Sequence, residues 1–298
     1  MNTAPRQPAA QLVQGRRTGA LSFGWLMADR VLRLGVAFVV GAMVARYLGP
    51  QEFGRLSYAI SWLALIGFLV PLGLDSILRR ELVQRPDHVD AVIGTVLGLR
   101  ILALVVCLCA AGALVGLAPS GDRLLLVATV GGMILPIATT YDVVLESSWL
   151  GRHAFLARMA STAAGAVIRI VLIAVGARTE AFASVVTIES GFLVIATALA
   201  FKAAPVRGGL RRFNPDIAFR LLKEAWPLIL AALSVTLYSR VDQLLLRHFL
   251  GDAALGAYAA AVRLSEMGHF VPMLAAATLF PTLASADRRG CAEKRASV

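Results

Sequence analysis

A series of long apolar runs, each close to the length that crosses a bilayer, constrains this sequence most. A helix needs about twenty mainly apolar residues to span the hydrocarbon core. The runs that meet this criterion are 21–45, 55–74, 91–117, 124–145, 158–177, 180–203, 225–247 and 254–283. In lipid the backbone must satisfy its own hydrogen bonds, which favours helices over open strands. The sequence therefore predicts an all-α polytopic membrane helix bundle with about eight transmembrane helices.

The composition and the placement of charge agree with this prediction. The chain is 58% apolar and 16% charged, with a mean hydropathy of +0.74, whereas soluble domains contain more charge. Its net charge of +11 is spread along loops, so we predict no nucleic-acid partner. With the N-terminus inside, the inner segments carry 18 of the 29 basic residues and the outer segments five. This bias predicts that both termini are cytoplasmic.

A turn between the first two runs recurs 202 residues later. Arg46-Tyr47-Leu48-Gly49-Pro50-Gln51-Glu52-Phe53-Gly54 aligns with His248-Phe249-Leu250-Gly251-Asp252-Ala253-Ala254-Leu255-Gly256. Repeats of this length in membrane proteins are typical of secondary transporters. The offset predicts a first six-helix lobe at 21–203 and a partial second lobe of two helices at 225–283. Polar tails are expected at 1–20 and 284–298.

The segment between the lobes, 204–224, predicts a cytoplasmic amphipathic linker. Asn214 and Pro215 form a helix start, and Ile217, Leu221 and Ala225 follow at four-residue spacing. We expect this helix to lie on the cytoplasmic leaflet. A second unit of six spans would extend well beyond Val298. The expectation is a naturally short protein, a fragment or a truncated reading frame, and the sequence leaves these three open.

Charged residues within the spans are the candidate functional groups, because each costs a few kcal/mol unless it has a partner, water or a function. The arginines are Arg30, Arg33, Arg100, Arg169, Arg240 and Arg263, and the acidic residues are Asp29, Glu189, Asp242 and Glu266. Asp29 with Arg33, and Arg263 with Glu266, have the spacing of ion pairs on one helix face. The residues predicted to serve as charge pairs or coupling groups are Asp29, Glu189, Asp242, Arg263 and Glu266.

The other arginines have no acidic residue at helical spacing on their own helix. Guanidinium groups match the oxygens of phosphate, so arginines that face a bundle interior favour a multivalent anion such as a lipid diphosphate. The predicted substrate-binding residues are Arg30, Arg33, Arg100, Arg169 and Arg240. Contacts with other helices or with backbone carbonyls are the alternative for each of them. Prolines in or at the edges of the spans predict kinks there: Pro71, Pro136, Pro227, Pro272 and Pro281.

The sequence shows no pattern of an enzyme, a metal site or a cofactor site. Cys107 and Cys109 lie two apart in an apolar run, Cys291 is in the tail, and four scattered histidines have no ligand spacing. Ser/His/Asp and phosphate-loop spacings are absent, and the predicted outer loops are short. We predict a protein that is not an enzyme and has no cofactor and no metal.

Three segments resemble one family. They are Ala45–Gly54, the stretch Gly73-Leu74-Asp75-Ser76-Ile77-Leu78-Arg79-Arg80-Glu81, and the stretch Ser239–Leu246 followed by Leu250-Gly251 to Glu266. They are similar to Wzx-type polysaccharide biosynthesis proteins, the oligosaccharide flippases of the multidrug/oligosaccharidyl-lipid/polysaccharide exporter superfamily. The likeness covers most of residues 20–285.

The resemblance implies two six-helix lobes with 12 to 14 helices around a cationic cavity, in a bacterial inner membrane. It implies transfer of undecaprenyl-diphosphate-linked oligosaccharide from the inner to the outer leaflet, with the arginines on the diphosphate and Asp29, Asp242 or Glu189 as coupling groups. Expected partners are the lipid-linked oligosaccharide, membrane lipids and other glycan-assembly proteins. This chain departs from the family pattern by lacking the last four or more helices. The alternatives are a cation-coupled multidrug or metabolite exporter and a non-transporting membrane partner in glycan assembly.

Overall fold

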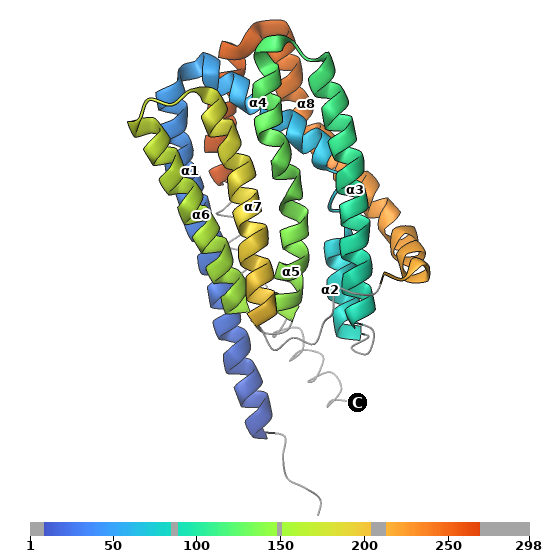
Figure 1. Ribbon diagram of the computed structural model, residues 1–298. Coiled ribbons are helices and arrows are strands. Elements are labelled where there is room, and N and C mark those ends of the chain that lie inside the picture. The colour runs from blue at the N-terminus through green and yellow to red at the C-terminus, as the bar shows by residue number, and fades with distance from the viewer. Residues whose placement is uncertain (1–8, 85–88, 148–150, 204–212, 269–298) are drawn as a thin grey trace, which may run out of the picture.

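The described part of the chain folds as a single elongated bundle of helices. The computed structural model describes residues 9–84, 89–147, 151–203 and 213–268. In chain order the helices are α1 (Ala9–Gly67), α2 (Leu74–Gln84), α3 (Val89–Leu117), α4 (Ser120–Val130), the 3₁₀ helix η2 (Gly131–Ile134), α5 (Leu135–Ser147), α6 (Gly151–Ala174), α7 (Thr179–Ala203) and α8 (Pro215–Gly268). The long segments α3, α4 to α5, α6 and α7 alternate in direction along the bundle (Figure 1).

The all-α membrane bundle predicted from the sequence is confirmed. Within the described residues, six helical segments are long and apolar enough to cross a membrane: 32–67, 89–117, 120–147, 152–174, 179–203 and 215–265. Two of these segments, in α1 and α8, contain a bend, which is why the sequence divides them into more runs. Large apolar side chains such as Leu102, Val105 and Val175 are exposed on the outside of the bundle, as expected for a surface that faces lipid.

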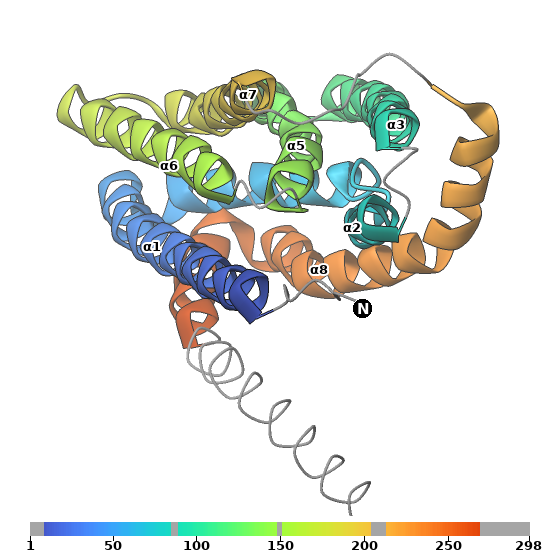
Figure 2. The same ribbon diagram turned by 90° about the horizontal axis from the view of Figure 1, so that it is seen from below.

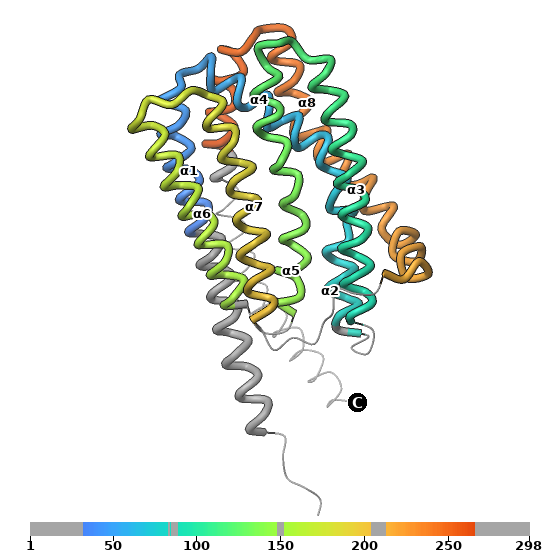
Figure 3. Tube along the Cα trace, viewed as in Figure 1, coloured from blue at the N-terminus to red at the C-terminus, as the bar shows by residue number. Residues whose placement is uncertain are grey.

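The two bends occur at the glycines of the duplicated turn. Gly49 has φ 71° and ψ 172°, and Gly251 has φ 83° and ψ −179°. A side chain disfavours this conformation strongly, so glycine is required at both positions. The two bends lie at the same end of the bundle, where α1 and α8 each change direction (Figures 1 and 3). The second turn thus reproduces the backbone of the first.

The two turns also touch each other through their backbones. A Cβ atom on Gly54 would collide with the carbonyl oxygen of Asp252, and one on Gly256 would collide with the carbonyl oxygen of Pro50. Residues 252 and 256 are the counterparts of 50 and 54 at the 202-residue offset, so the contact is reciprocal, as at a two-fold axis. Small residues permit such close crossings in membrane bundles. The repeat therefore defines a contact as well as a conformation.

The second predicted span, 55–74, is interrupted rather than continuous. Between α1 and α2 the chain forms turns in which Leu72 has φ 52° and Gly73 has φ 60°. Pro71 lies in this break, in agreement with the predicted kink. The span then continues through α2 to Gln84. Leu72 and Leu74, on either side of Gly73, are buried in a hydrophobic cluster.

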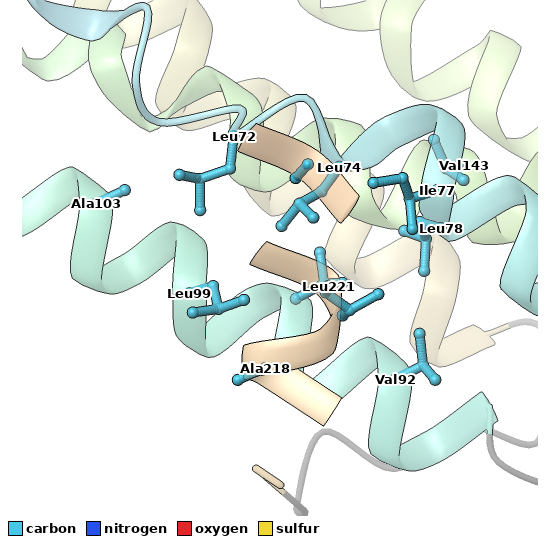
Figure 4. Close-up of a cluster of buried hydrophobic side chains, with 12 residues drawn as sticks. Leu72, Leu74, Ile77, Leu78, Val92, Leu99, Ala103, Val143, Ala218 and Leu221 are labelled. Atoms are coloured by element: carbon cyan, nitrogen blue, oxygen red, sulfur yellow. The ribbon is translucent and has the colours of Figure 1, made fainter. Parts of the chain in front are cut away.

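The predicted helix start at Asn214 is confirmed, and the apolar stripe that follows it packs against protein, while the cytoplasmic position of the linker 204–224 stays a prediction. The Asn214 side-chain oxygen accepts hydrogen bonds from the backbone N–H groups of Asp216 (2.9 Å) and Ile217 (3.3 Å). Leu221 and Ala225 are fully buried against α2 and α3 instead of facing lipid (Figure 4). The helix continues without a break into the next span and curves past α3 and α2 (Figure 2). Its apolar stripe is covered by protein because α2 presents a complementary apolar face.

Candidate functional site

A polar cavity of about 260 Å³ lies among α1, α5, α6 and α7, and three arginines line it. Arg33 from α1 and Arg158 and Arg169 from α6 line it, and Glu189 from α7 is the one carboxylate in its lining among the residues that the structure describes. The remaining lining residues are Leu135, Ser161, Thr162, Val186, Ser190 and Leu193. Hydroxyl groups and guanidinium groups supply hydrogen-bond donors, so the lining suits an anion. We call this space the polar cavity.

A second cavity, of about 320 Å³, adjoins the first. Its walls are mainly aliphatic and aromatic side chains of α1, α6 and α7, with Arg263 of α8 at one side. Thr162, Arg169, Val186 and Glu189 line both cavities. We call this second space the apolar cavity. The two cavities therefore meet at one short stretch of wall.

The ion pair between Arg169 and Glu189 forms the charged part of that shared wall. Arg169 Nη2 lies 2.7 Å from Glu189 Oε2, and the two side chains are 24% and 28% exposed. The backbone carbonyl of Glu189 also accepts a hydrogen bond from Ser161 Oγ at 2.9 Å. Helical spacing along α6 alone gives Arg169 no partner, and the packing of α7 supplies one.

Arg158 is held in the polar cavity by carboxylates behind it. Its Nη1 atom is 3.0 Å from Glu146 Oε1 and 3.3 Å from Asp142 Oδ2, both on α5. Arg79 of α2 also pairs with Glu146, at 2.8 Å. Asp142 and Glu146 do not line the cavity, so they orient the guanidinium group from outside it. Arg158 is not among the predicted site residues, because as the first residue of the run 158–177 it has the position of a loop arginine.

Arg100 lies elsewhere and is fully buried. Its Nη1 atom is within hydrogen-bond distance of the Pro136 carbonyl (2.6 Å) and the hydroxyls of Thr139 (2.9 Å) and Thr140 (2.6 Å). Its Nη2 atom pairs with Asp75 Oδ1 at 2.8 Å and reaches the Pro71 carbonyl at 3.5 Å. Arg100 therefore has contacts of the alternative kind, with other helices and backbone carbonyls, and joins α3 to α5 and to the break before α2.

The remaining predicted residues divide between the described and undescribed parts of the chain. Asp242 of α8 accepts a hydrogen bond from the Tyr258 hydroxyl. Arg240 is half-buried and lines neither of the two cavities. Arg263 lines the apolar cavity, with its guanidinium carbon 4.9 Å from the centre of the Phe53 ring. The side chains of Asp29, Arg30 and Glu266 lie outside the described residues, so both predicted pairs on one helix face remain predictions.

A second ionic cluster closes the end of the bundle that carries the glycine bends. Arg247 of α8 lies 2.6 Å from carboxylate oxygens of both Asp122 and Asp252, and its guanidinium carbon is 3.6 Å from the centre of the Tyr58 ring. Arg55 of α1 reaches the same Asp122 at 3.6 Å. These contacts tie α1, α4 and α8 together. None of these residues lines either cavity, so their geometry indicates a structural role.

Metal-ligating side chains do not cluster in the part of the chain that the structure describes. No group of three or more His, Cys, Asp or Glu side chains there could hold a metal ion. The Cys107 thiol is buried and donates to the Ile66 carbonyl at 3.2 Å, and Cys109 is exposed.

Comparison with known protein families gives one match. A family model described as "Polysaccharide biosynthesis protein" matches residues 21–286. The chain belongs to the polysaccharide biosynthesis protein family. This confirms the resemblance seen in the sequence and gives the protein a role in polysaccharide biosynthesis or export, as a multi-pass membrane protein. Searches of curated proteins and of solved structures gave no match.

Proposed function

We propose that this member of the polysaccharide biosynthesis family is a flippase, which transfers undecaprenyl-diphosphate-linked oligosaccharide from the inner to the outer leaflet of a bacterial inner membrane. The observation that carries the proposal is the polar cavity, where three arginines and one carboxylate meet inside the membrane-spanning part of the chain. Arginine binds phosphate oxygens in a planar, two-pronged geometry, so this lining favours a diphosphate over a neutral or cationic solute.

The proposed site differs from the set of arginines expected from the sequence. Arg33, Arg158 and Arg169 would bind the diphosphate, and Arg100 would keep the bundle packed. Glu189 would compete with the diphosphate for Arg169, and its release would couple substrate binding to uptake of a proton or another cation. Both termini would face the cytoplasm, as the distribution of basic residues favours.

Deletion of the gene in a strain without a sister gene tests the proposal. We expect the lipid-linked repeat unit to accumulate on the cytoplasmic leaflet, where a membrane-impermeant glycosidase added to spheroplasts cannot reach it. Wild-type protein should restore surface polysaccharide, and Arg169→Gln should not. Arg178→Gln is the matched control, because Arg178 is exposed and lines neither cavity. Normal surface polysaccharide in the deletion strain would overturn the proposal.

A further inference from the structure

The polar and apolar cavities have opposite chemistry but share a wall. We propose that they form one bipartite site, in which the polar cavity holds the anionic head of a lipid and the apolar cavity holds the first part of its hydrocarbon chain. This inference rests on the proposed function for the head group. It adds that the first lobe also recognises the hydrocarbon next to the diphosphate.

The lining of the apolar cavity supports the position of the hydrocarbon. Val40, Leu56 and Phe182 belong to a buried hydrophobic cluster, and all three line this cavity. A volume of about 320 Å³ is within the range of cavities that bind small organic ligands, roughly 300–1,000 Å³. The polar side chains in its lining, Thr162, Arg169, Glu189 and Arg263, leave the aliphatic and aromatic walls of α1, α6 and α7 as the surface for an apolar guest.

The shared wall supports a single ligand rather than two separate ones. Arg169 borders both cavities, so a phosphate bound to its guanidinium group lies beside the entrance to the apolar walls. A lipid diphosphate has this connectivity, because its first hydrocarbon unit is bonded directly to the phosphate. Free inorganic diphosphate would use the polar cavity alone.

Gly165 fixes where the two halves of the site meet. A Cβ atom at residue 165 would lie 2.8 Å from Glu189 Cδ and 3.0 Å from Arg169 Nη1. The ion pair thus rests against the bare backbone of α6, one turn before Arg169. We assign Gly165 as a positioning residue that leaves space for the pair at the junction of the cavities.

Inside a bilayer, we expect the apolar cavity to contribute more to selectivity for a ligand with a hydrocarbon chain than to the affinity for that ligand. Lipid tails are as apolar as the cavity walls, so a chain that moves from the bilayer into the cavity gains mainly from van der Waals packing. A probe that binds from water, however, also removes apolar surface from water. A short isoprenyl diphosphate should therefore bind detergent-solubilised protein more tightly than inorganic diphosphate does.

Direct binding to the purified full chain tests the proposal, with farnesyl diphosphate and inorganic diphosphate as probes. Ala166→Leu adds bulk to the apolar cavity, and Ala163→Leu adds the same bulk on the exposed side of the same helix. We expect Ala166→Leu to weaken farnesyl diphosphate about tenfold. Binding of inorganic diphosphate should not change, and Ala163→Leu should behave as wild type. Equal weakening of both probes, or none for farnesyl diphosphate, would overturn the bipartite site.

Photo-crosslinking of wild-type protein gives a second measurement that does not depend on the folding of a variant. A farnesyl diphosphate analogue with a photoreactive group on its hydrocarbon end should label residues of the apolar cavity, such as Val36 or Phe182. Labels confined to exposed residues would contradict the proposal. Wild-type protein that binds neither diphosphate probe would contradict the proposed function itself. Equal affinity for the two probes would contradict the bipartite site alone.

Discussion

Arg100 and Arg169 are both arginines inside the bundle, and each forms an ion pair with another helix, yet their surroundings differ. The Arg100 side chain is completely buried, and its terminal nitrogens have five acceptors from α2, α5 and the turn at Pro71. The Arg169 side chain is 24% exposed and has one carboxylate partner beside a cavity.

The surroundings of Arg100 and Arg169 distinguish a structural arginine from a ligand-binding one. A guanidinium group with five fixed acceptors gains nothing from a ligand and loses much if it moves. A guanidinium group with one partner and an adjoining cavity can exchange that partner for an anion of similar geometry. The number of acceptors and the space beside the group decide the role, and depth in the span does not.

The largest effect that we expect is on folding stability, when Arg100 is replaced. Arg100→Ala leaves Asp75 without its ion pair and removes the bonds that Arg100 donates to Thr139 and Thr140, so we expect a loss of about 3 kcal/mol of folding stability. Thermal unfolding of the purified protein measures this loss. Arg178→Ala, at an exposed arginine, should unfold like wild type. Wild-type stability of Arg100→Ala would mean that Arg100 is not the structural member of the pair.

Arg169→Gln should give the opposite pattern, with a small effect on stability and a large one on binding. The pair with Glu189 is partly exposed, so its loss should change stability by about 1 kcal/mol or less. Loss of a charge-assisted bond to phosphate costs roughly 1.5–3 kcal/mol, which is about 10- to 100-fold in affinity. Binding of inorganic diphosphate measures it. Unchanged affinity would remove Arg169 from the site.

The sequence predicts the spans and the duplicated turn well but not these two roles. Hydrophobic length identifies spans, and Gly49 and Gly251 are conspicuous because both follow leucine in matching contexts. Arg100 and Arg169 look alike in the sequence because helical spacing predicts partners on the same helix only and not on other helices. Asp75 is 25 residues before Arg100, on the preceding helix α2, and only tertiary packing brings the two together.

The same limit explains the other differences between sequence and structure. Arg158 is the first residue of the apolar run 158–177, where its position suggests a loop, and only the packing of α5 and α7 makes it a cavity residue. The stripe of Leu221 and Ala225 has the pattern of a helix on a lipid surface, since periodicity shows which face is apolar but not what covers it. Gly165 has one signal in the sequence, its spacing of four from Arg169, which places it on the same face of α6.

Glu189→Gln should increase the affinity for inorganic diphosphate, whereas Arg169→Gln should decrease it. If Glu189 competes with the ligand for Arg169, removing its charge frees the guanidinium group for the anion. We expect inorganic diphosphate to bind roughly two- to fivefold more tightly, the equivalent of about 0.5–1 kcal/mol for a partly exposed pair. Titration of the purified variant beside wild type measures this. Weaker binding would show that Glu189 orients Arg169 instead of competing for it.

Gly165→Ala has the smallest expected effect, but it tests geometry without removing any charge. The added methyl group would displace the pair of Arg169 and Glu189, and a displaced side chain costs about 0.5–1 kcal/mol, which predicts roughly threefold weaker binding of diphosphate. Alanine in a helix is more favourable than glycine by about 1 kcal/mol, so stability should stay close to that of wild type.

Gly112→Ala is the matched control for this last variant, because a Cβ atom at Gly112 meets nothing within 4 Å. It should gain stability from helix propensity, and its affinity for diphosphate should equal that of wild type. Weaker binding in Gly165→Ala together with unchanged binding in Gly112→Ala would show that the position of the pair, and not its charge alone, sets affinity. Equal affinity in both variants would mean that the arginine tolerates displacement, and Gly165 would then have no positioning role. That outcome would leave Arg169 a flexible ligand-binding arginine and would widen its contrast with the rigid Arg100.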